Sequence, residues 1–144
     1  MAFGAKFGLH ARVIGYIANA PRTHTVSFDP DRAGGKGAQT INGNIFLDPA
    51  KFPQQIADVK GMTLAEAFVH ELGHTLKPYF SSIVDIDAKY AATPGAGNDA
   101  FTVFLENYWR RNVLGTAAND IRSFYLSQGD IRFPGTKLEE VWPP

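Results

Sequence analysis

Two histidines and a glutamate stand close together near the middle of the chain, in the run His70-Glu71-Leu72-Gly73-His74. Residues four apart on a helix share one face, so both imidazoles can reach one Zn²⁺ at about 2.0–2.1 Å. The glutamate projects beside the metal, where it can take a proton from zinc-bound water and pass it to a leaving amine. Because zinc lowers the pKa of its water to roughly 7, the run predicts metal-assisted hydrolysis with Glu71 as general base.

The residues around this run predict a helix over residues 64–77. Thr63 and Glu66 form a Thr-x-x-Glu capping box at its start, and Pro78 ends it. Apolar residues surround most of the segment, which indicates a helix buried inside a domain. Gly73 costs about 1 kcal/mol of helix propensity relative to alanine, so we expect another element to approach there. This context favours a metal site over an ordinary amphipathic helix that carries histidines.

A catalytic zinc needs a third protein ligand and one position left open to water. Glu106 lies far enough after His74 for the chain to bring a second helix against the first. Its alternative role is that of a solvated helix residue pairing with Arg110 four positions on. Other candidates for the third ligand are acidic residues and histidines elsewhere in the chain: Asp85, Asp87, Asp99, His10 and His24. Spacing alone leaves this choice open.

A second helix is predicted after Gly97. Asn98 or Asp99 can cap its start, and Leu114-Gly115 closes it. Its apolar residues recur at helical spacing, at Phe101, Phe104, Leu105 and Tyr108. The stretch between the two helices, residues 79–97, is expected to be less regular.

Residues 1–40 are expected to form a β-rich region whose role the sequence does not define. Residues 23–28 alternate as a strand does, whereas residues 12–17 fit either a strand or a short helix. The glycine-rich segment 32–37 lacks the Gly-Lys-Ser/Thr ending of a phosphate-binding loop, so a plain turn is favoured.

Residues 41–47 are the next strand candidate, within which Asn42-Gly43 fits a turn or a bulge. An edge strand beside a metal-binding helix can align an extended substrate through backbone hydrogen bonds. Asn44, Ile45 and Phe46 are the predicted substrate-aligning residues.

The composition indicates one domain with no affinity for nucleic acid. The chain has 144 residues, 44% of them hydrophobic, and its 14 basic residues balance 14 acidic ones. No apolar stretch predicts a membrane span, and the N-terminus lacks the pattern of a signal peptide. Since the chain has no cysteine, histidine, aspartate or glutamate must hold any metal.

A longer sequence pattern begins within the predicted second helix. Glu106-Asn107-Tyr108-Trp109-Arg110, then Leu114-Gly115, Arg122 and Tyr125, resembles the EN-x-x-R, LG and R-x-x-Y tail of HExxH peptidase domains. Those domains stand at the C-terminal ends of Rhs-type and other polymorphic bacterial toxins, and related zinc proteases occur among injected bacterial effectors. The resemblance covers residues 41–126, with the strand at 44–48 and the HExxH run in the same order.

This resemblance implies a single zincin-like α+β domain over residues 1–144, with a catalytic core at 41–126. A small β-sheet would pack on the HExxH helix and on a second helix that bears a ligand. Glu106 would join His70 and His74 as the third ligand of one Zn²⁺ per chain. The resemblance also implies a protein or peptide substrate, secretion or delivery into a target cell, and a cognate immunity protein as partner.

The other polar residues near the predicted site have less definite roles. Tetrahedral oxyanions are commonly stabilised by Tyr, His or Arg, and Tyr79, Arg122 and Tyr125 are the candidates. Asn107 and Arg110 are expected to orient the ligand helix from behind the metal. Two other functions stay open, namely hydrolysis of a peptidoglycan amide and a non-catalytic binding module stabilised by zinc.

Overall fold

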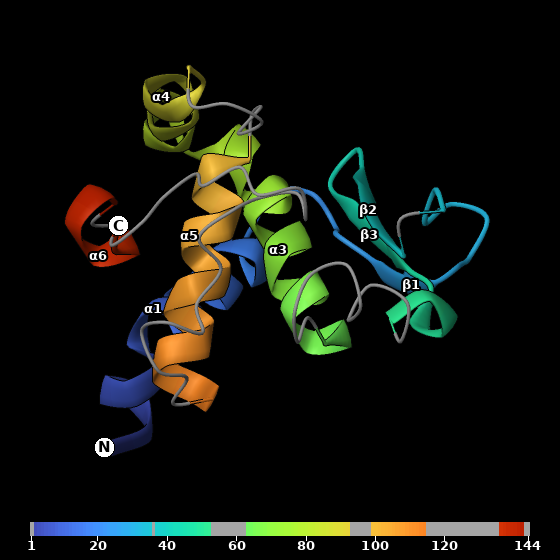
Figure 1. The fold of residues 1–144 in the computed structure, drawn as a ribbon, viewed down its shortest axis with the longest axis horizontal. Helices are drawn as coiled ribbons and strands as arrows, with labels where there is room; N and C mark the ends of the chain where they lie inside the picture. The colour runs from blue at the N-terminus through green and yellow to red at the C-terminus, as the bar shows by residue number, and fades with distance from the viewer. Residues whose placement is uncertain (1, 36, 53–62, 93–98, 115–135, 143–144) are drawn as a thin grey trace.

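The computed structural model describes residues 2–35, 37–52, 63–92, 99–114 and 136–142. These residues form an α+β fold of helices and a three-stranded mixed sheet. Figure 1 shows helix α3 (Leu64–Leu76) between helix α5 (Ala100–Trp109) on one side and the sheet on the other. The α+β prediction is therefore confirmed, and the predicted metal-binding helix is the element that both layers cover.

Helix α3 begins where the capping signal places it. The Thr63 hydroxyl accepts the backbone N–H of Glu66 at 3.2 Å, which satisfies one of the free donors at a helix start. Helix α5 is buried along its length from Ala100 to Tyr108, its polar residues Thr102, Glu106 and Asn107 included. It continues into a π-helical segment, η3 (Arg110–Leu114). Both predicted helices are confirmed, with the second ending in this looser turn.

The two helices come close together at Gly73. A β-carbon added there would lie 2.6 Å from Thr102 Cγ2 and 3.1 Å from Thr102 Cα. Only a glycine leaves room for α5 at this distance, so the predicted approach of a second element is confirmed. The approach brings the polar residues of α5 against the histidines of α3.

The sheet consists of β1 (Val26–Phe28), β2 (Ala38–Ile41) and β3 (Asn44–Leu47) in the order β1-β3-β2. Strand β1 runs parallel to β3, and β2 runs antiparallel to it. Asn42 and Gly43, with φ of 50° and 77°, form the two-residue turn of the β2–β3 hairpin. The turn interpretation of Asn42-Gly43 is thus confirmed, and residues 41–47 are two strands rather than one.

The β-rich prediction for residues 1–40 is wrong for their first half. Residues Ala2–Ala18 form helix α1, on which Leu9 and Val13 lie one turn apart and reach the core. The helical alternative for residues 12–17 is therefore the correct one. Packing against α3 decides the conformation of a segment whose short apolar pattern fits either state.

A further helix, α4 (Ser81–Tyr90), lies within the stretch expected to be irregular. Ile83 and Ile86 are buried at helical spacing, and the buried Asp87 accepts the Phe101 N–H at 3.0 Å. Short helical turns η1 (Pro49–Lys51), η2 (Lys77–Tyr79) and α6 (Leu138–Val141) complete the described fold. No helix among the described residues is long and apolar enough to cross a membrane.

Candidate metal centre

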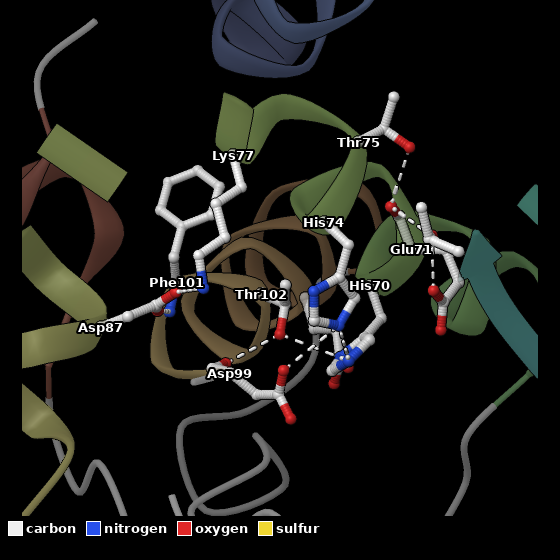
Figure 2. A network of polar contacts seen from close by, with 11 residues as sticks. His70, Glu71, His74, Thr75, Lys77, Asp87, Asp99, Phe101 and Thr102 are labelled. Carbon is white, nitrogen blue, oxygen red and sulfur yellow. Dashed lines mark hydrogen bonds and ion pairs between the residues drawn. The ribbon is translucent and has the colours of Figure 1, made fainter. Parts of the chain in front are cut away.

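The HExxH residues point to two different sides of α3. His70 and His74 face α5, whereas Glu71, one residue on and therefore rotated by about 100°, faces the sheet (Figure 2). His70 and Glu71 are buried, each 7% exposed, whereas the His74 side chain is partly exposed, at 28%. Their ligand atoms lie within 4.8 Å of one another, so the motif residues form one cluster.

The two histidine rings approach each other through their Nε2 atoms. His70 Nε2 and His74 Nε2 are 3.3 Å apart. Two nitrogens bound to one tetrahedral zinc at about 2.0–2.1 Å would lie roughly 3.3–3.4 Å apart. The residues present therefore fit a single metal ion without rearrangement of the helix.

The surroundings of His74 favour the uncharged imidazole. Its pKa is lowered mainly because burial disfavours the charged ring, and the neighbouring His70 adds to this effect. Glu71 and Asp99 act in the opposite direction and do not reverse it. A neutral ring keeps the lone pair that a metal ligand needs.

Glu106 lies behind His70. Its carboxylate contacts Nδ1 of His70, the ring nitrogen that does not face His74. Glu106 is fully buried, so its alternative role as a solvated helix residue is wrong. Its contact is therefore with the edge of the His70 ring that faces away from His74.

The first turn of α5 lies at the near edge of the two rings. Asp99 Oδ1 is 3.2 Å from His74 Nε2, and Thr102 Oγ1 is 3.3 Å from His70 Nε2. The Thr102 hydroxyl donates to the Asp99 carbonyl oxygen at 2.7 Å, which ties this turn together. Figure 2 shows Asp99 and Thr102 beside the paired histidines.

Directly after α5, at the first residue of η3, Arg110 pairs with Glu66 at 2.6 Å, and both side chains are buried. Glu66 therefore uses its backbone N–H for the Thr63 cap and its carboxylate for Arg110. Burial raises the pKa of Glu66, and the nearby Arg110 offsets only part of this effect. This pair links α3 to the residue that follows α5, and the orienting role of Arg110 stays a prediction. Asn107 is also fully buried on α5.

On the sheet side, Glu71 meets Thr40 of strand β2. The Thr40 hydroxyl lies 2.6 Å from Glu71 Oε2 and 3.1 Å from the Glu71 carbonyl oxygen, and it donates to these oxygens. This contact holds one carboxylate oxygen of Glu71 on the sheet side of the helix. Thr40 is not among the predicted site residues, because residues 38–40 precede the stretch 41–47 that the sequence pattern predicts to be a strand.

The predicted substrate-aligning residues Asn44, Ile45 and Phe46 are not at a sheet edge. They lie in β3, which pairs with β1 on one side and β2 on the other. The Ile45 N–H donates to the Thr25 carbonyl at 2.8 Å, so it is already used within the fold. The edge assignment is wrong because the chain turns at Asn42-Gly43 and β1 then covers the second side of β3.

The remaining candidates lie elsewhere. His24, a candidate metal ligand, contacts Tyr79, a candidate for oxyanion stabilisation: His24 Nε2 lies 2.6 Å from the Tyr79 hydroxyl. The other ring nitrogen, His24 Nδ1, lies 2.8 Å from the Gly43 carbonyl oxygen. Asp87 pairs with Lys77 at 2.7 Å, and Asp85 is exposed on α4. Arg122, Tyr125, Asn98 and the His10 side chain lie outside the described residues.

Comparison with known proteins gives no relative for this chain: no family model, no curated protein and no solved structure matches it. The site must therefore be interpreted from its own residues. The resemblance to toxin peptidases stays a prediction from the sequence.

Proposed function

We propose that this chain is a zinc-dependent peptidase that hydrolyses peptide bonds, with Glu71 as general base. The observation that supports this most strongly is the 3.3 Å separation of the His70 and His74 Nε2 atoms, with Glu71 in the same cluster. Zinc held by the two histidines would supply a Lewis acid that polarises a carbonyl and lowers the pKa of water. Glu71 accepts the proton of the attacking water and returns it to the leaving nitrogen.

The intact glutamate favours an enzyme over a zinc-stabilised binding module, because a purely structural site needs no base. Thr40 supports this role by donating to Glu71 Oε2, which holds that oxygen in place and leaves the other carboxylate oxygen to accept a proton. The second carboxylate oxygen is then the one that takes up the proton. A site of two histidines and a flanking carboxylate is suited to hydrolysis of an amide.

The edge of β2 is the proposed place for an extended substrate. Residues next to a two-residue turn exchange both hydrogen bonds with their partners, so Gln39 and Ile41 point their backbone groups at β3. Ala38 and Thr40 then direct theirs to the opposite side, where no strand pairs among the described residues. A peptide bound there would run past Thr40, whose side chain contacts Glu71.

Hydrolysis assays test this proposal. Metal-free protein reloaded with one equivalent of zinc should cleave an unstructured protein such as casein, and a chelator should stop the cleavage. Cleavage of purified sacculi without cleavage of protein would instead favour the peptidoglycan amidase. Zinc binding without hydrolysis of either substrate would favour the binding module.

Methylated peptides test the strand alignment separately. Methylation of single backbone nitrogens on either side of the cleaved bond removes donors for pairing with β2. We expect the methyl group to abolish cleavage at alternate positions, as an edge-paired strand requires. Equal cleavage of every methylated peptide would mean that the substrate does not pair with β2. The proposed zinc chemistry would not be affected by this result.

On the sequence resemblance, we propose that the enzyme acts as a toxin or effector delivered into a target cell, with a cognate immunity protein. Production of the chain inside cells should arrest growth, and the Glu71→Gln variant should not. Co-production of a small neighbouring gene product should restore growth. Normal growth with an active, folded enzyme would contradict the toxin assignment.

A further inference from the structure

The polar residues of α5 meet His70 at two opposite edges of its ring. Glu106 contacts Nδ1, and Thr102 approaches Nε2 from one turn earlier in the helix. The two nitrogens of an imidazole have different roles at a metal, because the one that does not bind usually donates to an orienting group. The position of each α5 residue therefore indicates its task.

We propose that Asp99 supplies the third protein ligand and that Glu106 is a positioning residue that orients His70 from behind. This inference rests on the proposed zinc site and assigns the roles within it. It departs from the role that the sequence resemblance implies for Glu106.

The contact of Glu106 has the form of a histidine support. A carboxylate at Nδ1 accepts the proton there, which fixes the tautomer and leaves the Nε2 lone pair toward His74. Glu106 is fully buried, and burial keeps its carboxylate from solvent competition. To bind a metal held between the two Nε2 atoms, this carboxylate would have to leave Nδ1 and reach the other edge of the ring.

Asp99 has the position that Glu106 lacks. Its Oδ1 lies 3.2 Å from His74 Nε2, which is close to the roughly 3.3 Å expected between two ligand atoms of a tetrahedral zinc. Asp99 stands at the N-cap of α5, yet its side chain makes no capping hydrogen bond. A residue type that normally caps its own helix here turns its carboxylate to the histidine instead.

Thr102 fixes this arrangement. Its hydroxyl proton goes to the Asp99 carbonyl at 2.7 Å, so the oxygen presents a lone pair to His70 Nε2. Thr102 Oγ1, His70 Nε2, His74 Nε2 and Asp99 Oδ1 thus follow one another at 3.3, 3.3 and 3.2 Å. A cation beside this row of acceptor atoms would satisfy them better than a single shared hydrogen-bond donor. Asp99 is 19% exposed at its side chain, so the region also stays open to solvent on one side.

Zinc affinity measured by competition with a chromophoric chelator tests the two roles. Asp99→Asn should weaken zinc binding by more than about 100-fold, since a ligand carboxylate is lost. Glu106→Ala should weaken it about 10–100-fold, as loss of an orienting partner does. Glu106→Gln keeps an oxygen that accepts from Nδ1, so it should restore most of the affinity lost by the alanine variant. Asp85→Asn, an exposed aspartate on α4, is the matched control and should bind zinc as the parent does.

A zinc-loaded crystal structure gives a second readout that does not depend on stability. The Asp99 oxygen should lie about 2.0–2.2 Å from the ion, while Glu106 stays at His70 Nδ1. Parent-like affinity in folded Asp99→Asn together with a large loss in Glu106→Gln, or a Glu106 oxygen on the metal, would overturn the role assignment. If the unmodified chain binds no zinc at all, the proposed function itself fails, which is a different result from an exchange of roles.

Discussion

The two sides of α3 hold their polar residues in different ways. Toward α5, three residues of α3 face Glu106 of that helix and the two residues that flank it, in the pairs Glu66–Arg110, His70–Glu106 and His74–Asp99. Toward the sheet, Glu71 relies on the single hydroxyl of Thr40 in a four-residue edge strand. The first side is a closely packed interface that is buried at Glu66 and His70 and partly open to solvent at His74, and the second is a local contact at a sheet edge.

This difference matches what the proposed function requires of each side. Metal ligands need fixed distances, and a buried helix pair with Gly73 at its closest approach fixes them. A general base must instead reach water and substrate, so it is suited to the side where an extended chain can bind. Substitutions on the α5 side should therefore change stability and metal affinity, whereas those on the sheet side should change turnover.

The largest effect on turnover is expected from Glu71→Gln. The amide cannot accept the proton of the attacking water, so hydrolysis should fall about 10²–10⁴-fold while zinc binding is kept. Peptide cleavage and zinc content measured on one preparation check this outcome. Glu139→Gln, an exposed glutamate on α6, serves as control. Substantial activity in Glu71→Gln would assign the base to another residue.

The largest effect on stability is expected from Arg110→Met. Its loss leaves Glu66 buried without its cation, which typically costs about 3–5 kcal/mol. The adjacent Arg111→Met breaks a pair with the half-exposed Glu139 and should cost below about 1 kcal/mol. Urea unfolding of the metal-free proteins measures both. Equal losses would mean that the buried pair does not hold the helices together.

The Arg110→Met variant should also show a pH dependence. Burial raises the pKa of Glu66 above its ordinary value of 4.5. The Glu66 carboxyl group therefore binds its proton more tightly in the native state than in the unfolded chain. A raised acid pKa disfavours the native state above the folded pKa, and this cost fades as the pH falls toward 4.5. Without Arg110 the pKa rises further, so the stability deficit of the variant should shrink on acidification. A deficit that grows on acidification would contradict this.

Gly73→Ala should have an intermediate effect. The added carbon would meet Thr102 Cγ2 at 2.6 Å, and overpacking of this kind costs about 1–3 kcal/mol. Thr102→Ser removes that methyl group, so the double variant should be less destabilised than the sum of the single changes. Gly15→Ala on α1, where no heavy atom lies within 4 Å, should not destabilise the fold. Additive losses in the double variant would place the helices further apart than described.

Thr40→Val should have the smallest effect. Loss of the Thr40 hydroxyl removes a hydrogen bond to the Glu71 carboxyl group, for which about a tenfold fall in turnover is expected, with little change in zinc affinity. Thr40→Ser keeps the hydroxyl and should retain parent-like turnover. If the valine variant lost zinc and kept its turnover, Thr40 would instead help to hold the metal.

Local signals were sufficient to predict the helix pair of the fold. Each of these signals depends only on residues that are close together in the sequence. They are the Thr63 cap, the helical spacing of Phe101 and Phe104, and Gly73. The sheet could not be derived in this way. Its order depends on β1 pairing with β3 across the hairpin, a contact between distant residues that no local pattern encodes. The burial of Ile83 and Ile86, which makes α4 a helix, is likewise a tertiary effect.

The candidate site divides in the same way. The i,i+4 spacing of the two histidines predicted that they would meet, whereas the edge of the ring that each α5 residue contacts depends on the rotation of α5. The sequence does carry one signal for the α5 residues of the site. Polar residues recur along the otherwise apolar α5 region at helical spacing, at Asp99, Thr102, Glu106 and Arg110. Such a stripe indicates a polar face turned to a partner helix and would have identified Thr102 and favoured Asp99.

The central claim is that His70 and His74 hold one zinc ion, and zinc content measures it most directly. Elemental analysis after gentle purification and zinc loading should find about one equivalent per chain. His70→Ala and His74→Ala, each shown to be folded, should lose it, whereas His24→Ala, whose contacts are with Tyr79 and Gly43, should keep it. Absence of zinc from the unmodified chain, or full retention in both folded motif variants, would contradict the account.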